Sequence, residues 1–301
     1  MNEQIQSFLD KLQNTPYVGQ GYTNLLKRYG DYYNRVMQRH FEALNRYTEG
    51  DAKRFEKATD AFFELTFETL RLQSKYFSSG VFSLPPEQRE EVHKNDELME
   101  GTYLLGLFLA AIFWENHFEK MNYFEETVPS LLPANAKVLD IGAGSGLFTS
   151  IALLNRPDIE IVAVDISPVS ERLINELHLE AAPPDTPVTF KTGSFPDISN
   201  DVGNKYDAIF FSDVVEHLPD PEAGMAAVKE LLNSEGFVFF ATATNAAFFD
   251  HTIVFSDVAE IENLLARHSF SPERSMQVPV LTNKDGQRVI DYFAILRLMD
   301  T

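Results

Sequence analysis

The sequence predicts an α/β fold in which a doubly wound, mostly parallel sheet follows an all-helical segment. From Lys137 onward, short apolar runs alternate with helical patterns, which is typical of parallel strands covered on both faces. Before that point, apolar residues recur every three or four positions, and little is typical of a strand. We therefore expect a helical domain over residues 1–100 and an α/β domain over 101–301.

Three long helices are expected in the first part of the chain. One apolar face runs from Tyr22 to Val36, and a second runs from Phe55 to Tyr76 after an N-cap at Asp51. A third helix is expected from Asp96 to Phe124. Aromatic side chains are common on these helices and are more often core than pocket. They are Tyr32, Tyr33, Phe62, Phe63, Phe67, Phe113 and Trp114.

The second part of the chain shows an alternating order of elements. Strands are expected over 138–141, 161–164, 188–190, 208–211 and 237–241. Helices are expected between or after them, near 147–155, 168–178, 221–233 and 256–268. Apolar runs at 278–281 and 292–298 flank the turn residues 283–286 and predict an antiparallel hairpin at the edge of the sheet.

Composition limits the classes of function. The 301 residues have a formal net charge of −20 and contain no cysteine, which excludes disulfides, thiolate metal sites and a cysteine nucleophile. Acidic side chains outnumber basic ones in both 1–130 and 131–301, so the basic surface that binds nucleic acid is missing. The longest uncharged stretch, Gly101–Trp114, is shorter than the roughly 20 residues of a membrane span. The N-terminus lacks the pattern of a secretory signal, and we expect a cytoplasmic protein.

The segment Gly142-Ala143-Gly144-Ser145-Gly146 lies between an apolar strand and a helix. Glycines allow a tight turn there and a close approach of the backbone to a ligand, which then faces the free N–H groups of the helix. A dinucleotide fingerprint would place its third glycine at position 147, where this chain has Leu147. The loop therefore favours a nucleoside ligand over a dinucleotide.

Asp165 ends the next apolar strand. A carboxylate in this position is placed to accept hydrogen bonds from ribose hydroxyls. The alternative is that Asp165 caps the following helix, because Ser167-Pro168 is also typical of a helix start.

From about residue 115 to 301, these motifs resemble, in order, those of the class I S-adenosylmethionine-dependent methyltransferases. The resemblance implies a Rossmann-like domain, S-adenosyl-L-methionine as cofactor and S-adenosyl-L-homocysteine as product. It implies that Asp140 lies near the methionine end of the cofactor and that residues 193–195 lie beside the adenine, with Ser194 where the family often has an acid. The cofactor-binding residues expected from it are Asp140, Gly142, Ala143, Gly144, Gly146, Asp165, Ile166, Gly193, Ser194, Phe195, Ser212 and Asp213.

Glu216 and His217 follow the fourth predicted strand and are the candidates for chemistry. Methyl transfer from a sulfonium depends mainly on the position of the acceptor. A hydroxyl or an acidic carbon also needs a base, and histidine titrates in the useful range. We predict that His217 is a general base with Glu216 beside it; the alternative is that the pair only shapes a loop. The sequence leaves open whether oxygen, nitrogen or carbon is methylated.

The spacing of Asp213, Glu216 and His217 resembles the Glu-x-x-Glu-His motif of two metal-assisted branches. These are the ubiquinone-type O-methyltransferases and the small-RNA 3′-end methyltransferases. The resemblance implies a divalent metal held by these three residues, with His251 completing the set, as a second possibility. The acidic charge disfavours the RNA branch.

The acceptor pocket is predicted from the helix that leads into the first strand. Its candidate residues are Phe113, Trp114, His117 and Tyr123, together with His251. We expect the helical segment to act as a lid, a homodimer surface or both. The predicted function is methyl transfer to a small molecule of specialised metabolism, as in natural product biosynthesis. The alternatives are a metal-assisted O-methyltransferase of the ubiquinone type and a non-catalytic cofactor-binding protein that acts through its helical domain.

Overall fold

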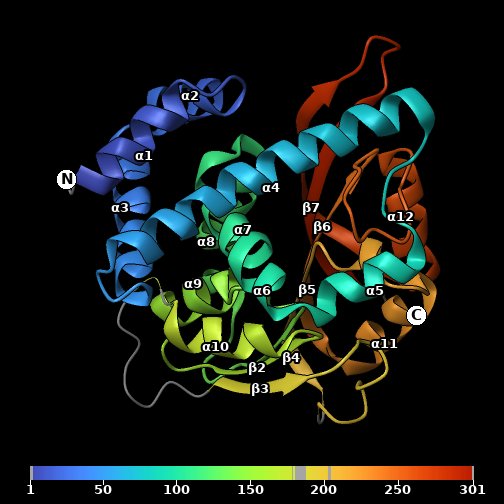
Figure 1. Ribbon diagram of the computed structural model, residues 1–301. Helices are drawn as coiled ribbons and strands as arrows, with labels where there is room; N and C mark the ends of the chain where they lie inside the picture. The colour runs from blue at the N-terminus through green and yellow to red at the C-terminus, as the bar shows by residue number, and fades with distance from the viewer. Residues whose placement is uncertain (1–2, 178, 180–187, 203–204, 300–301) are drawn as a thin grey trace.

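The computed structural model describes residues 3–177, 179, 188–202 and 205–299 (Figure 1). In this part of the chain, seven strands form one sheet of order β3-β2-β1-β4-β5-β7-β6. The strands are β1 (Lys137–Ile141), β2 (Glu160–Asp165), β3 (Val188–Thr192), β4 (Tyr206–Ser212), β5 (Leu232–Thr244), β6 (Phe270–Thr282) and β7 (Arg288–Leu298). The first five are parallel, and β7 pairs antiparallel with both β5 and β6. The predicted fold class and hairpin are confirmed.

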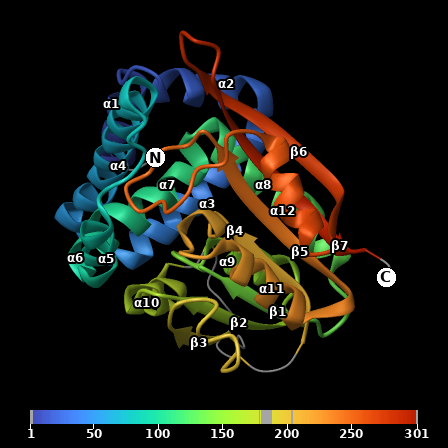
Figure 2. The same cartoon turned by 90° about the vertical axis from the view of Figure 1, so that its right-hand side faces the viewer.

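Helices follow the parallel strands as the sequence predicts. They are α9 (Leu147–Asn155), α10 (Pro168–Glu176), α11 (Pro221–Leu231) and α12 (Val258–Arg267), with a short 3₁₀ turn, η2 (Val215–His217), directly after β4. Side chains cap three of them at the N-terminus: Ser167 caps α10, Asp220 caps α11 and Asp257 caps α12. Figure 2 shows the three long strands β5, β6 and β7 running side by side.

The helical segment is built from eight α-helices and one π-helix within the described residues. They are α1 (Glu3–Gln13), α2 (Val18–Tyr29), α3 (Asp31–Tyr47), α4 (Ala52–Ser79), α5 (Pro86–Lys94), α6 (Asp96–Leu98), the π-helix η1 (Met99–Leu104), α7 (Leu105–Phe113) and α8 (Glu115–Leu131). Asp51 caps α4 as predicted, because its carboxylate accepts from the N–H groups of Lys53 and Arg54. Helix α4 crosses the molecule from α3 to the side of β6 and β7 (Figure 1).

The single helix predicted over Tyr22–Val36 is wrong, because two helices occupy this range. Gly30 adopts φ +51 and ψ −123 and separates α2 from α3. A residue with this backbone conformation cannot continue a right-handed helix. The apolar spacing continues across the break because both helices bury side chains, such as Leu25 and Tyr33, in the same core.

The long helix predicted from Asp96 to Phe124 is also wrong. The range contains α6, the π-helix, α7 and the start of α8, and Trp114 between α7 and α8 is extended, with φ −94 and ψ 124. Among the described residues, no single helix has both the length and the hydropathy to cross a membrane. The neighbouring helices Asp96–Phe113 and Glu115–Leu131 meet both criteria only when taken together, and they are bent by 80° at the break.

Apolar side chains of the strands point alternately to the two faces of the sheet, and helices cover both faces. On one face, Phe210 and Phe239 pack with Phe124 of α8 in a core that continues into α1 to α4. On the other face, Phe211 and Phe240 belong to the core formed with α11 and α12. The helical segment therefore shares its core with the sheet.

Candidate active site

A cavity of about 1060 Å³ opens where β1, β2 and β4 end, at the carboxyl edge of the parallel strands. Open α/β sheets bind their ligands at this edge. The volume is at the upper end of the ~300–1,000 Å³ usual for ligand sites, so it accommodates a nucleoside cofactor and a second small molecule. Side chains from α4, the π-helix, α7 and α8 close the cavity opposite the strand ends.

The glycine loop forms one wall of this cavity. Gly142 and Gly144 have φ of +69 and +55, which favours glycine, and both line the cavity. A Cβ atom on Gly142 would lie 2.5 Å from the side chain of Val214. Gly146 is not among the residues that line the cavity. A Cβ atom there would lie 2.6 Å from Ile174, so Gly146 allows α9 and α10 to pack closely.

Asp165 faces the cavity from the end of β2. One carboxylate oxygen accepts from the Gly144 N–H at 2.8 Å, and the other accepts from the Ser167 N–H at 2.8 Å. The carboxylate thus fixes the glycine loop relative to the start of α10. The residue that caps α10 is Ser167, whose hydroxyl accepts from Val169 N at 3.3 Å. The alternative in which Asp165 is the cap of this helix is wrong.

Asp140 at β1 is buried at the same wall. The Thr149 hydroxyl donates to one of its oxygens at 2.6 Å, and burial raises the pKa of Asp140 to about 7. The other predicted cofactor-binding residues that line the cavity are Ala143, Ile166, Gly193, Ser194, Phe195, Ser212 and Asp213.

Glu216 and His217 lie on the 3₁₀ turn after β4, at the cavity wall. Glu216 is 4 % exposed, its Oε2 has no hydrogen-bond partner among the described residues, and burial raises its pKa to about 7. His217 Nδ1 lies 3.2 Å from the carboxylate of Asp250. Burial lowers the pKa of His217, but Asp250 outweighs this and raises it to about 9. Both residues predicted for chemistry therefore face the cavity.

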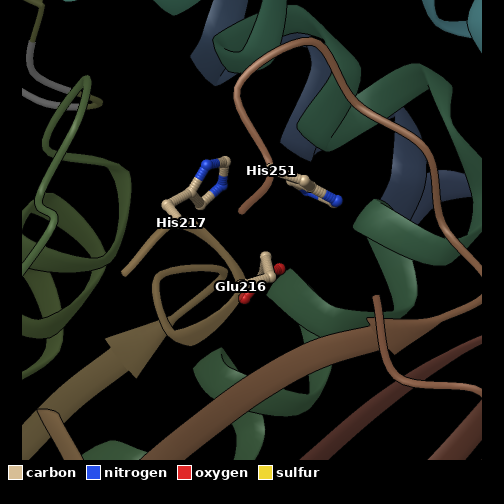
Figure 3. Close-up of side chains that lie close together, drawn as sticks. All are labelled: Glu216, His217 and His251. Atoms are coloured by element: carbon tan, nitrogen blue, oxygen red, sulfur yellow. The ribbon is translucent and has the colours of Figure 1, made fainter. Parts of the chain in front are cut away.

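His251 approaches the same place from the loop after β5. Its ring centroid lies 4.8 Å from that of His217, and the two rings are nearly perpendicular. Its Nδ1 is 3.1 Å from the Ala246 carbonyl, and burial lowers the pKa of His251 to about 3. Glu216, His217 and His251 can each offer one ligand atom, and these atoms lie within 4.8 Å of one another (Figure 3).

Asp213 is not part of this group, which corrects the predicted metal set of Asp213, Glu216 and His217. Its carboxylate instead lies 2.5 Å from Lys120 Nζ of α8, and Lys120 lowers the pKa of Asp213 against the effect of burial. Lys120 is 3 % exposed and lies 3.6 Å from a second carboxylate, the buried one of Asp291 on β7. Burial lowers the pKa of Lys120, but the two carboxylates outweigh it and raise the pKa.

The predicted acceptor residues divide into two groups. Trp114, His117 and His251 line the cavity. Phe113 does not, because it is fully buried among aromatic rings of the helical core, 5.2 Å from Phe8. Tyr123 does not line it either, because its ring packs on Phe293 of β7 at 5.2 Å. The extended residue Trp114 breaks the single helix on which Phe113, Trp114, His117 and Tyr123 were expected.

The cavity also contains residues that no sequence motif identifies. Gln73 of α4 donates to the Asn245 carbonyl at 2.9 Å and accepts from the Ala247 N–H at 2.8 Å, so it holds the loop after β5. Tyr103 of the π-helix donates to Asp250 at 3.2 Å. Gln73 stands among the polar residues Arg71, Ser74 and Lys75, where a glutamine is usually a surface residue. The partners of Gln73 and Tyr103 are more than a hundred residues away in the chain, so no local signal marks them.

A family model described as a methyltransferase domain matches residues 113–292, which is more than half of the chain. A ubiquinone biosynthesis O-methyltransferase of Xanthomonas axonopodis pv. citri is 33% identical over 121 residues, covering 39% of this chain and 48% of that protein. The corresponding protein of Acinetobacter baumannii is 25% identical over 144 residues, covering 44% of this chain and 58% of that protein. The chain thus spans about half the length of these curated relatives.

Two solved structures are similar to this chain at low identity. One is the N-methyltransferase NodS of Bradyrhizobium japonicum in complex with S-adenosyl-L-homocysteine, at 14% identity and a TM-score of 0.48, covering 71% of this chain and 98% of that one. The other is the 1,6-didemethyltoxoflavin-N1-methyltransferase of Burkholderia thailandensis, at 19% identity and a TM-score of 0.44, covering 72% of this chain and 91% of that one. With the glycine loop, Asp165 and the ordered parallel strands at one cavity, the family match identifies the chain: it belongs to the methyltransferase-domain family and has the fold of the class I S-adenosylmethionine-dependent methyltransferases.

Proposed function

We propose that this enzyme methylates a hydroxyl of a small molecule and that His217 is the general base. The observation that carries the proposal is the position of His217. It lies at the cavity wall beyond β4, with Nδ1 beside Asp250 and 20 % of the side chain still exposed. The neutral imidazole takes the proton of the acceptor as the oxygen attacks the methyl group. Because the effect of burial is outweighed by Asp250, which raises the pKa of His217 to about 9, this neutral form predominates only at alkaline pH, and we expect turnover to rise toward pH 9. Buried Glu216 lies next to His217 and is proposed to keep the base oriented toward the acceptor.

The cofactor, when bound, supplies a methyl group on a positively charged sulfur. We propose that the glycine loop holds its methionine end together with Asp140, and that Asp165 receives the ribose hydroxyls. Gly142 and Gly144 support this because both line the cavity and have positive φ values that favour glycine. The remaining proposed cofactor contacts are Ala143, Ile166, Gly193, Ser194, Phe195, Ser212 and Asp213, which line the same cavity. The acidic side chains there suit a cationic ligand.

The acceptor is proposed to occupy the part of the cavity nearest the helical segment. Trp114 and Leu107 from the helices, Val280 and Val289 from the hairpin, and Phe248 from the loop after β5 give this part apolar walls. An apolar or aromatic molecule with one reactive hydroxyl fits such walls, because only the reacting group needs a polar partner. A compound of specialised metabolism is the first candidate. The helical segment then serves as a lid over the acceptor, and its outer surface is the proposed site of any homodimer.

The proposal is tested by incubating the enzyme with S-adenosylmethionine and matched phenol, enol and amine acceptors, and by identifying products by mass spectrometry. We expect methylated phenols, and we expect His217→Ala to lower kcat by about 10²- to 10⁴-fold, the usual contribution of a general base. Turnover of amines with no turnover of hydroxyl acceptors, or full activity in His217→Ala, would contradict the proposal.

A second candidate is a metal-assisted O-methyltransferase of the ubiquinone type. Two observations favour it: the curated relatives named above, and the group formed by Glu216, His217 and His251. Two donors of the group are available, because Glu216 Oε2 has no partner among the described residues and His251 engages only Nδ1 with Ala246. Two imidazoles and one carboxylate suit Zn²⁺, Fe²⁺ or Mn²⁺ better than Mg²⁺, and a metal there would polarise the acceptor hydroxyl.

The two candidates are separated by measurements of metal binding and of activity. Calorimetric titration with Mn²⁺, before and after treatment with a chelator, reports binding without any acceptor. We expect Glu216→Gln and His251→Ala to abolish the heat of Mn²⁺ binding if the metal-assisted candidate is correct. If the parent enzyme does not bind Mn²⁺ and the chelator does not change its activity, the metal-assisted candidate is wrong and only the base mechanism remains.

A further inference from the structure

The carboxylate of Asp250 lies between two side chains that come from other parts of the chain. Its Oδ1 is 3.2 Å from His217 Nδ1, and its Oδ2 accepts from the Tyr103 hydroxyl at 3.2 Å. His217 belongs to the turn after β4, Asp250 to the loop after β5, and Tyr103 to the π-helix. Three segments therefore meet at one buried carboxylate.

This ion pair favours one orientation of the imidazole. A carboxylate beside one ring nitrogen sets which nitrogen carries the proton and leaves the other for chemistry. The Asp250 side chain is 0 % exposed at the cavity wall, and it contacts His217 and Tyr103. Its influence on the reaction is therefore expected to pass through His217.

Tyr103 fixes the carboxylate in turn. Its ring packs against Phe248 and Phe249, the two residues before Asp250, with centroids at 5.8 and 5.1 Å. The next residue of the π-helix, Leu104, lies beside Gly144, where its side chain would be 3.6 Å from an added Cβ. One turn of π-helix thus contacts both the glycine loop and the support of His217. Single π-turns are frequent at functional sites.

We infer that Asp250 and Tyr103 are positioning residues for His217, and that they hold its free nitrogen toward the acceptor. The inference rests on the proposed role of His217 as base. Both residues lie at the cavity wall, and the role inferred for them is to position His217 rather than to bind the cofactor.

The kinetic test compares three single variants, Asp250→Asn, Tyr103→Phe and His217→Ala. It also includes the double variant that combines Asp250→Asn with His217→Ala. We expect Asp250→Asn to lower kcat about 10- to 100-fold, the usual cost of losing a carboxylate that orients a histidine. We expect Tyr103→Phe to lower it about fivefold. KM for the cofactor should stay unchanged in both. In the His217→Ala background, Asp250→Asn should cause no further loss, because its effect acts through that ring.

The matched controls are Tyr76→Phe and Asp257→Asn. Tyr76 accepts a hydrogen bond from Gln287 at 3.4 Å, and Asp257 caps α12; neither lines the cavity. Both should leave kcat unchanged, and circular dichroism checks that every variant is folded. A loss of equal size from Asp250→Asn with and without His217 would overturn the inference.

A second measurement does not depend on turnover and separates this inference from the proposed function. Crystal structures with S-adenosylhomocysteine bound should show the His217 ring facing residue 250 in the parent enzyme and displaced in Asp250→Asn, with the cofactor contacts unchanged. If His217→Ala kept full activity, the base would be wrong, while the displaced ring would still show the positioning. An undisplaced His217 ring in Asp250→Asn would overturn the positioning itself.

Discussion

The single residue Asp165 has one structural role and one proposed binding role. It holds the glycine loop through the Gly144 N–H and is the proposed acceptor of the ribose hydroxyls. Replacing it with asparagine removes the charge that strengthens these hydrogen bonds, each of which contributes about 1.5–3 kcal/mol. We expect the Kd for S-adenosylhomocysteine to rise about 10- to 150-fold in Asp165→Asn, as measured by calorimetry. The control is Asp60→Asn, which removes the exposed ion pair between Asp60 of α4 and Lys11. It should leave the Kd unchanged.

Lys120 is a second residue whose replacement should have a large effect, in this case on the free energy of unfolding. Its ammonium is the cation between the partly exposed carboxylate of Asp213 and the buried carboxylate of Asp291. Lys120→Met keeps most of the volume but leaves both carboxylates without their cation, which should cost about 3–5 kcal/mol of unfolding free energy in a denaturant titration. The exposed pair of Lys11 and Asp60 gives the comparison, since Lys11→Met should cost less than about 1 kcal/mol. Equal losses in the two variants would contradict this account.

At the scale of elements, α4 controls the loop that carries Asp250 and His251. Gln73→Leu removes both hydrogen bonds to the loop backbone and leaves an N–H and a carbonyl unpaired. We expect faster amide hydrogen exchange over 245–251 and a lower kcat, with unchanged affinity for S-adenosylhomocysteine. Gln38→Leu on α3, whose amide contacts only Glu42, should change none of these. Unchanged exchange over 245–251 in Gln73→Leu would show that α4 does not hold the loop.

The elements also show which features a sequence can predict. The strands, the glycine loop, the hairpin and the cap at Asp51 depend on local patterns, and the structure confirms them. The breaks at Gly30 and Trp114 were missed because apolar periodicity continues through a change of direction when both helices bury their faces in one core. Lys120 and Asp250 were missed for a different reason. Their roles arise from partners on other elements, and a single sequence carries no record of those contacts.

For the whole molecule, the buried histidines make stability depend on pH. His40 of α3 is fully buried beside Phe108, and burial lowers its pKa from 6.5 to about 3. Between these values the unfolded chain binds more protons than the folded one, so the free energy of unfolding falls as the pH falls from 6.5 toward 3. His40 alone should account for about 2 kcal/mol of the loss by pH 5.

The variant His40→Leu tests this contribution by denaturant titration at pH 7 and pH 5. The variant should lose about 2 kcal/mol less than the parent protein between the two values. His117 and His251 are also buried with lowered pKa values, so part of the acid sensitivity should remain. The control His268→Gln changes an exposed ion pair with Glu222, and it should keep the full loss. The same pH dependence in His40→Leu and the parent would assign the acid sensitivity to other groups.

The position of β7 in the sheet has a consequence for folding during translation. β7 lies between β5 and β6, so the last strand to be synthesised among the seven described is an interior strand of the sheet. It also brings Asp291 to Lys120. Until residues 288–298 have left the ribosome, β5 has an open edge and the ammonium of Lys120 lacks one of its two carboxylates. A nascent chain therefore completes its charge-balanced site late in translation, and β5 and β6 stay exposed to misassembly until then.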